Sequence, residues 1–185
     1  EVLQYIADGI KIKAAEADAM YADIVIDTNN FTNQTGVRTF EAAAFLRRNG
    51  ADVTRVRKLF RDDMQDYKAR AAAISSAEIY REAFSIGVCP SEGLPSPTIV
   101  CAQAANELLE IKGIKASVVM TEYHGLIYLS ARSIDEVNVQ VMMEKLGGGG
   151  HRTIAGAQLS GISMEEAKDR VKAVIDEMLQ KGDIS

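Results

Sequence analysis

The second half of the chain alternates apolar and polar positions in a pattern that predicts a small β-sheet. Residues 115–121 and 126–131 form two runs rich in β-branched and apolar side chains, and Tyr123-His124-Gly125 between them is typical of a hairpin turn. Three shorter segments are further candidates for strands or for the entry into strands: 83–88, 97–100 and 158–160. The pattern therefore indicates several short strands joined by tight turns.

Helical spacing of apolar residues predicts three helices in the same half. One covers residues 102–112 and ends at Gly113, and a second covers residues 138–146. The third begins at Ser163, where a Ser-x-x-Glu sequence predicts a capping box. Its apolar positions recur at helical spacing, and we expect them to face the core: Ala167, Val171, Val174, Ile175 and Met178.

The first half of the chain is mostly helical by the same criteria. Helices are predicted over 12–22, 39–49 and 52–61, whereas 24–27 is either a buried strand or the apolar end of a helix. We predict three parts: residues 1–62, a helical connector over 63–84, and a domain over 85–185. The predicted fold class is α/β, a small mixed sheet with packed helices that follows a mostly helical segment.

Composition narrows the class of protein only moderately. The chain has 185 residues, enough for one or two compact domains, and carries a net charge of −5. An acidic balance disfavours a general nucleic-acid coat protein but leaves room for one local anion site. Cys89 and Cys101 match no zinc spacing, so we expect both to be buried, reduced thiols. There is no signal peptide and no apolar run of membrane-spanning length.

Four successive glycines followed by a histidine form the most informative segment of the chain. Gly147, Gly148, Gly149 and Gly150 leave the backbone amides open to a bulky anion, and His151 can donate a hydrogen bond to it or act as an acid or base. The alternative is a helix C-cap followed by a turn. Because a cap needs only one glycine, the run favours an anion site.

Other candidate residues have a structural reading beside the functional one. Asp27 could be a ligand for a hard metal ion, or it could cap the turn that follows it. Arg38 could bind phosphate or pair with Glu41. Arg132 precedes a predicted helix start and favours an anion site. Two assignments complete the list: Ser133 with Glu136 forms a possible capping box, and His124 is expected to be an exposed turn residue.

These motifs together resemble the DHH family of phosphoesterases with their DHH-associated substrate-binding domain. The resemblance covers essentially the whole chain and is greatest to the GdpP-type cyclic-di-AMP phosphodiesterases. The glycine-histidine motif alone is shared more widely, with RecJ nucleases, nano-RNA oligoribonucleases and the C-terminal domain of alanyl-tRNA synthetases. The matching segments are residues 24–31, 35–47, 130–133 and 143–151, together with Ala155-Gly156-Ala157.

The resemblance implies a catalytic site with two manganese ions that activate water for attack on a phosphodiester. Asp27 matches the last metal-binding aspartate of the catalytic domain. Arg132, the four glycines and His151 match residues that hold the substrate phosphate and nucleotide, and Ser133 is a weaker match. The expected partner is a cyclic dinucleotide or a short oligonucleotide.

The chain also departs from the family pattern, because the early metal-binding motif and the Asp-His-His triplet are absent. We therefore expect a fragment that binds substrate without efficient hydrolysis. The fragment is expected in the cytoplasm without membrane contact, as a possible homodimer, with a parent protein anchored in the plasma membrane. Two alternatives are a hydrolase of nano-RNA or 3′-phosphoadenosine phosphate, and a non-catalytic nucleic-acid-binding module.

Overall fold

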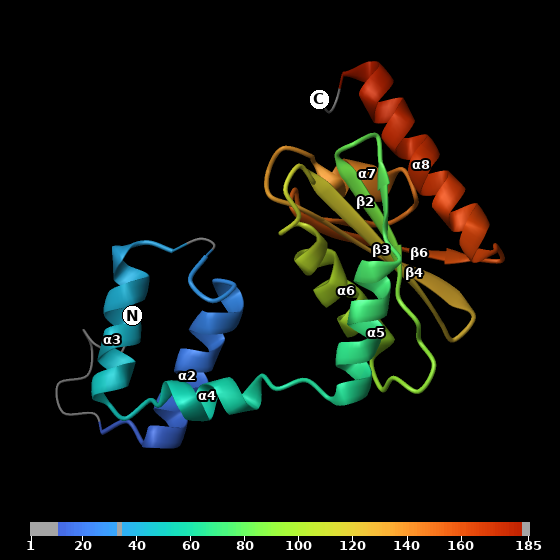
Figure 1. Cartoon of the computed structure of the whole chain (residues 1–185). Helices are drawn as coiled ribbons and strands as arrows, with labels where there is room; N and C mark the ends of the chain where they lie inside the picture. The colour runs from blue at the N-terminus through green and yellow to red at the C-terminus, as the bar shows by residue number, and fades with distance from the viewer. Residues whose placement is uncertain (1–10, 33–34, 183–185) are drawn as a thin grey trace. The chain divides into compact units, whose positions relative to one another are not determined.

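The chain forms two compact units, which meet in sequence between Asp62 and Asp63. The structure is a computed structural model that describes residues 11–32 and 35–182 (Figure 1). Residues 1–10 of the predicted first part lie outside the described residues. Each unit is described by itself below.

The first unit is helical, with α2 (Ala14–Asp27), α3 (Val37–Arg48) and α4 (Val53–Leu59). Its small core holds the buried side chains of Ala17, Leu46 and Ala51. The chain leaves α3 at Asn49-Gly50, and Gly50 has a φ of +97°, which only glycine adopts readily. Asp52 then caps α4 by accepting a hydrogen bond from the main-chain N–H of Arg55 (2.8 Å). The connection between α3 and α4 is therefore a tight turn with a capped helix start.

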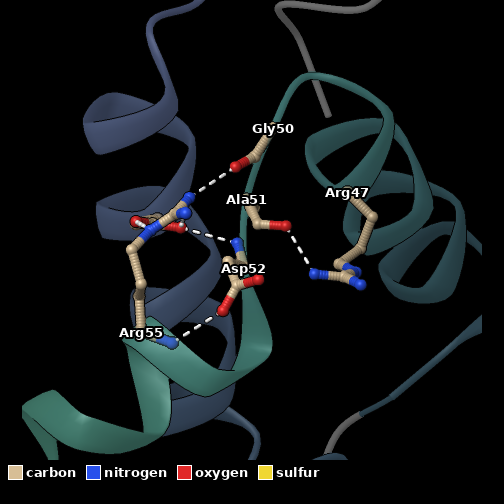
Figure 2. Close-up of polar contacts among 6 residues, drawn as sticks. Arg47, Gly50, Ala51, Asp52 and Arg55 are labelled. Carbon is tan, nitrogen blue, oxygen red and sulfur yellow. Dashed lines mark hydrogen bonds and ion pairs between the residues drawn. The ribbon is translucent and has the colours of Figure 1, made fainter.

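A buried carboxylate connects α2 to the start of α4. Asp18 accepts a hydrogen bond from the main-chain N–H of Asp52 (2.7 Å) and an ion-paired one from Arg55 Nε (2.6 Å). Arg55 also donates to the carbonyl of Gly50 (2.7 Å), as Figure 2 shows. The hydrogen bond from Arg55 lowers the pKa of Asp18. One ionised side chain thus fixes the turn between α3 and α4 against α2.

The second unit contains a six-stranded mixed sheet in the order β1-β2-β3-β4-β6-β5. All neighbouring strands are antiparallel except β2 and β3, which are parallel. The strands are β1 (Glu78–Tyr80), β2 (Phe84–Val88), β3 (Ala116–Tyr123), β4 (Leu126–Ser133), β5 (Gly149–Gly150) and β6 (Ile154–Ser160). The helices are α5 (Met64–Ser75), α6 (Pro97–Leu108), α7 (Val139–Glu144) and α8 (Met164–Lys181). This architecture confirms the predicted α/β class.

Helices cover both faces of this sheet (Figure 1). On one face α7 and α8 enclose the larger core, and the predicted stripe of α8 is buried there in full. On the other face α6 packs over β2, β3 and β4, and α5 packs on α6. Two hydrogen bonds hold α6 to the sheet, from Ser117 Oγ to the carbonyl of Ala105 (2.6 Å) and from Cys101 Sγ to the carbonyl of Val119 (3.1 Å).

Both cysteines are free and buried, as predicted. Burial raises the pKa of the Cys89 thiol to about 11 and that of Cys101 to about 12. Thiols with such pKa values stay protonated at neutral pH, so they pack as small apolar groups.

Several sequence predictions are corrected by the structure. Residues 97–100 are the first turn of α6, where Pro97 occupies N1, rather than part of a strand. Residues 24–27 end helix α2, so of the two alternatives for this segment the helix end is confirmed and the strand is excluded. The segment 63–84 is helical only through Ser75 and then forms β1. Strand β5 was not predicted, because two glycines carry no apolar pattern.

No helix in the part of the chain that the structure describes is both long enough and apolar enough to cross a membrane.

The Asp18 contacts predict a pH-dependent stability of the first unit. Because the pKa of Asp18 is lower in the folded chain than its ordinary value of 3.8, its contribution is present above that value and is lost as the pH falls through the folded-state pKa. We expect Asp18→Asn to speed amide hydrogen exchange in residues 50–59 at pH 7, and the difference from the unmodified chain to shrink at acidic pH. Asp23→Asn, an exposed change on the same helix, is the matched control. Equal exchange in both variants at pH 7 would contradict this role.

Candidate functional site

The glycine run begins as the C-cap of α7. The main-chain N–H of Gly148 donates to the carbonyl of Met143 (2.8 Å), and that of Gly147 donates to the carbonyl of Glu144 (3.0 Å). This pair of bonds, with Gly147 at a φ of +80°, is a Schellman motif. The alternative considered for the run, a helix cap, is therefore correct for Gly147.

Gly148 and Gly150 are required for a second reason, the close approach of the backbone to β6. A Cβ atom on Gly148 would overlap the carbonyl oxygen of Gly156 and lie 2.6 Å from Ala157 Cα. A Cβ atom on Gly150 would lie 2.6 Å from Ala155 Cα, and one on Gly156 would lie 2.8 Å from the carbonyl of Leu129. Real side chains do not make such contacts. These three glycines let β4, β6 and the glycine run pack as nearly bare backbone.

Gly149 differs from its neighbours. A Cβ atom there would meet no atom within 4 Å, and its φ lies outside the left-handed region. Gly149 pairs with Gly156 on β6, which in turn pairs with Ser130 on β4. Three positions with small or absent side chains thus lie in one row across the edge of the sheet. Neither capping nor packing explains the glycine at position 149.

A groove of about 500 Å³ opens beside this row. Its lining contains two polar side chains and otherwise apolar groups and backbone: Tyr128, Leu129, Gly147, Gly148, Gly156, Ala157 and Gln158. The volume is in the range of small-molecule sites. Backbone and small side chains at its floor allow a ligand to approach the main chain closely.

Arg132 lies on β4 on the same side of the sheet as Ser130, two residues further along the strand. Its Nε is buried without a hydrogen-bond partner, and Nη1 donates to the carbonyl of Ala131 (2.9 Å). Within residues 11–32 and 35–182 no carboxylate pairs with this guanidinium. Burial lowers the pKa of Arg132. A half-buried cation that lacks a counter-ion is costly unless an anion binds beside it.

His151 is exposed in the turn between β5 and β6. Its main-chain N–H donates to the carbonyl of Ile154 (2.7 Å), which closes the turn. The neighbouring Arg152 pairs with Asp135 (2.7 Å), and its carbonyl accepts from the N–H of Val139 at the start of α7. The turn is therefore anchored at both sides, while the imidazole projects from a fixed backbone.

The hydroxyl of Ser133 makes a hydrogen bond within the chain. It is the buried last residue of β4, on the face opposite Arg132, and its Oγ donates to the carbonyl of Val137 (2.6 Å). The predicted capping box with Glu136 is wrong, because α7 begins at Val139 and Asn138 is its N-cap, accepting from the N–H of Gln140 (3.1 Å). The hydroxyl of Ser133 thus shapes the loop before α7.

Asp27 is exposed at the C-terminal end of α2, in the first unit. The turn after it is held by Thr28, whose hydroxyl donates to the carbonyl of Ile24 (2.6 Å) and accepts from the N–H of Phe31 (2.9 Å). Arg38 is exposed in the first turn of α3. His124 is exposed at the tip of the β3–β4 hairpin with a φ of +51°, as expected for a turn residue.

Among the described residues, no group of three or more His, Cys, Asp or Glu side chains comes together in a way that could hold a metal ion. A site for two manganese ions needs several carboxylates and imidazoles, and Asp27 supplies one carboxylate. The described residues therefore do not fit a complete dinuclear centre.

A known domain family matches much of the second unit. Residues 96–181 match the DHHA1 domain, which includes α6, the glycine run and α8. Residues 96–181 therefore form a DHHA1 domain. This match agrees with the resemblance to the DHH-family phosphoesterases that the sequence motifs indicated.

Two relatives that match nearly the whole chain are bacterial cyclic-di-AMP phosphodiesterases. The chain is 41% identical over 184 residues to the cyclic-di-AMP phosphodiesterase GdpP of Bacillus subtilis, covering 98% of this chain and 28% of that protein. It is 40% identical over 177 residues to the cyclic-di-AMP phosphodiesterase PdeA of Listeria monocytogenes, covering 95% of this chain and 27% of that protein. The chain thus spans less than a third of the length of these relatives.

A solved structure shares the fold. An exopolyphosphatase-related protein from Bacteroides fragilis superimposes with a TM-score of 0.80 at 21% identity, covering 90% of this chain and 51% of that one. At this identity the likeness establishes the fold alone.

The glycine run predicts a sharp difference between two adjacent substitutions. Gly148→Ala places a methyl group against the backbone of β6, and we expect it to lower the free energy of unfolding by about 1–3 kcal/mol or more. Gly149→Ala meets open space, and we expect a change within about 0.5 kcal/mol. Urea unfolding of both variants measures the difference. Similar losses for the two variants would show that the run has a single, purely structural role.

Proposed function

We propose that this chain is the nucleotide-binding part of a manganese-dependent cyclic-di-AMP phosphodiesterase. The observation that carries the proposal is Arg132, a half-buried guanidinium that has no counter-ion among the described residues. It lies on the same sheet face as the row of Ser130, Gly156 and Gly149. A nucleotide phosphate supplies the missing negative charge. The names of the two curated relatives, which match over 95–98% of this chain, support the choice of substrate.

The chain's own groups have distinct tasks in this proposal. Arg132 provides fixed positive charge and hydrogen-bond donors for a phosphate. Gly149 leaves room for the phosphate or sugar to approach the main chain, and a methyl group there would occupy that room. His151, at the anchored turn, provides a further donor to the ligand. These groups bind and orient the substrate.

We further propose that hydrolysis depends on metal ligands outside this chain. The chain spans 28% of the length of the Bacillus subtilis relative, and Asp27 is the residue here that matches a metal-binding aspartate. Two manganese ions held by the rest of the parent protein would activate the attacking water. The isolated chain is then a binding fragment with little or no activity.

The oligoribonuclease alternative and the nucleic-acid-binding module are not favoured, because relatives at 40–41% identity over nearly the whole chain are cyclic-di-AMP phosphodiesterases, whereas the match to an oligoribonuclease covers 39% of the chain. Membrane anchoring of a parent protein, a cytoplasmic position for this part, and homodimer formation stay predictions.

Removing the guanidinium tests the proposed phosphate site. We expect Arg132→Ala to weaken binding of cyclic-di-AMP or the linear dinucleotide pApA about 10- to 100-fold, because a charge-assisted hydrogen bond is lost. Isothermal titration calorimetry measures the affinity. Arg170→Ala, which removes an exposed arginine on α8 paired with Glu166, is the matched control. Unchanged affinity in Arg132→Ala would refute the phosphate role.

Activity measurements separate binding from catalysis. The chain alone, incubated with cyclic-di-AMP and Mn²⁺, should bind the nucleotide but release no hydrolysis product detectable by chromatography. The parent protein should hydrolyse it, and Gly149→Ala in the parent should raise KM with normal folding. Full turnover by the isolated chain would contradict the proposed division of labour.

A further inference from the structure

The two polar side chains that line the groove are Tyr128 on β4 and Gln158 on β6. The two residues are direct partners in the antiparallel β4–β6 pair. Both stand at even-numbered positions, on the same side of the sheet as Ser130, Gly156 and Arg132. Both line the groove. Side chains paired in this way lie close enough to contact one ligand together.

Arg132 is not part of the lining of the groove but lies further along β4, on the same face of the sheet. Tyr128 is four residues from Arg132, which corresponds to about 13 Å along a strand. Ser130 lies between the two on β4 with the thiol of Cys101 from α6 beside it, whereas Gly156 and Gly149 in the same row carry no side chain. A nucleotide lying along β4 with its phosphate toward Arg132 would therefore place its base toward Tyr128 and Gln158.

The tyrosine is suited to stack on a base. Its ring is partly buried and packs at 6.4 Å, centroid to centroid, on Tyr123, whose ring contacts that of His124 at 3.9 Å. The neighbouring rings restrict the orientation of the Tyr128 ring, so a base would meet this ring in a defined position. Stacking alone does not distinguish one base from another.

The glutamine can make that distinction. The side-chain amide of Gln158 is exposed and makes no hydrogen bond within the described parts of the chain. An amide donates and accepts at once, which complements the N6 amino group and N7 of adenine. Guanine presents two acceptors on the same edge, for which arginine or lysine is the matching partner. Neither residue type lines the groove.

We propose that Tyr128 and Gln158 form an adenine-recognition subsite, with Tyr128 as the stacking surface and Gln158 as the residue that selects adenine over guanine. This inference rests on the proposed nucleotide-binding function and adds to it a direction for the ligand and a determinant of base specificity.

The experiment is a titration of the whole chain with three probes: AMP, GMP and ribose 5-phosphate, which lacks a base. AMP should bind at least about 5-fold more tightly than GMP. Gln158→Leu should bring the two affinities together without changing that of ribose 5-phosphate. Tyr128→Leu should weaken AMP and GMP alike, about 5- to 100-fold, and leave ribose 5-phosphate unchanged. Arg132→Ala should weaken all three.

Matched controls separate local effects from general ones. Gln140→Leu replaces a glutamine on α7 that pairs with Glu144, and Tyr67→Leu replaces an exposed tyrosine on α5. Neither residue lines the groove, and neither change should alter any of the three affinities.

Each outcome has a separate meaning. Equal affinities for AMP and GMP in the unmodified chain, or a Gln158→Leu variant that still prefers AMP, would overturn the inference while the phosphate site stands. Weakened binding of ribose 5-phosphate by the Tyr128→Leu variant would show that the Tyr128 ring stabilises the fold and does not stack on the base. If no probe binds even to the unmodified chain, the proposed function fails and the subsite fails with it.

Discussion

The close contact between the glycine run and β6 is the constraint on which the candidate site depends. Gly148 and Gly150 lie against the backbone of β6 at distances that exclude any Cβ, and Gly156 lies equally close to β4. This packing adds the two-residue strand β5 to the edge of the sheet. It also fixes where α7 ends and where His151 begins its turn. The groove exists because three backbone segments meet here with almost no side chains between them.

The placement of Arg132 becomes understandable against this packing. Arg132 lies on the face of the sheet that α6 covers, and its guanidinium is half-buried there. This burial lowers the pKa of Arg132. The fold offers no carboxylate to it among the described residues, although the chain as a whole is acidic. Net charge therefore says little about this site, because the local arrangement of one cation and bare backbone decides what can bind.

The sequence predicted the elements whose pattern is local. The buried stripe of α8, the β3–β4 hairpin and the strand ending at Ser160 follow from side-chain spacing and turn residues alone. The prediction of a strand at residues 97–100 was wrong because a proline after a turn can begin either a strand or a helix. Only the packing of α6 on the sheet decides between the two.

Only part of the candidate site could be predicted from the sequence, and the residues that were missed were missed for different physical reasons. Arg132 and the glycine run were found from residue type and from the family resemblance. The separate reasons for each glycine could not be found, because they depend on how closely the folded backbone approaches β6, a distance that residue spacing does not give. Tyr128 and Gln158 were missed because they meet only through the β4–β6 register.

The absent counter-ion of Arg132 links the ligand to the stability of the domain. An anion that binds the folded chain and not the unfolded one offsets the desolvation of the guanidinium, so occupancy raises the free energy of unfolding in proportion to RT ln(1 + [L]/Kd). The second unit then has two free energies of unfolding, one with the anion bound and one without it. In a cell where the concentration of the proposed nucleotide ligand varies, the free energy of unfolding of the domain would vary with it.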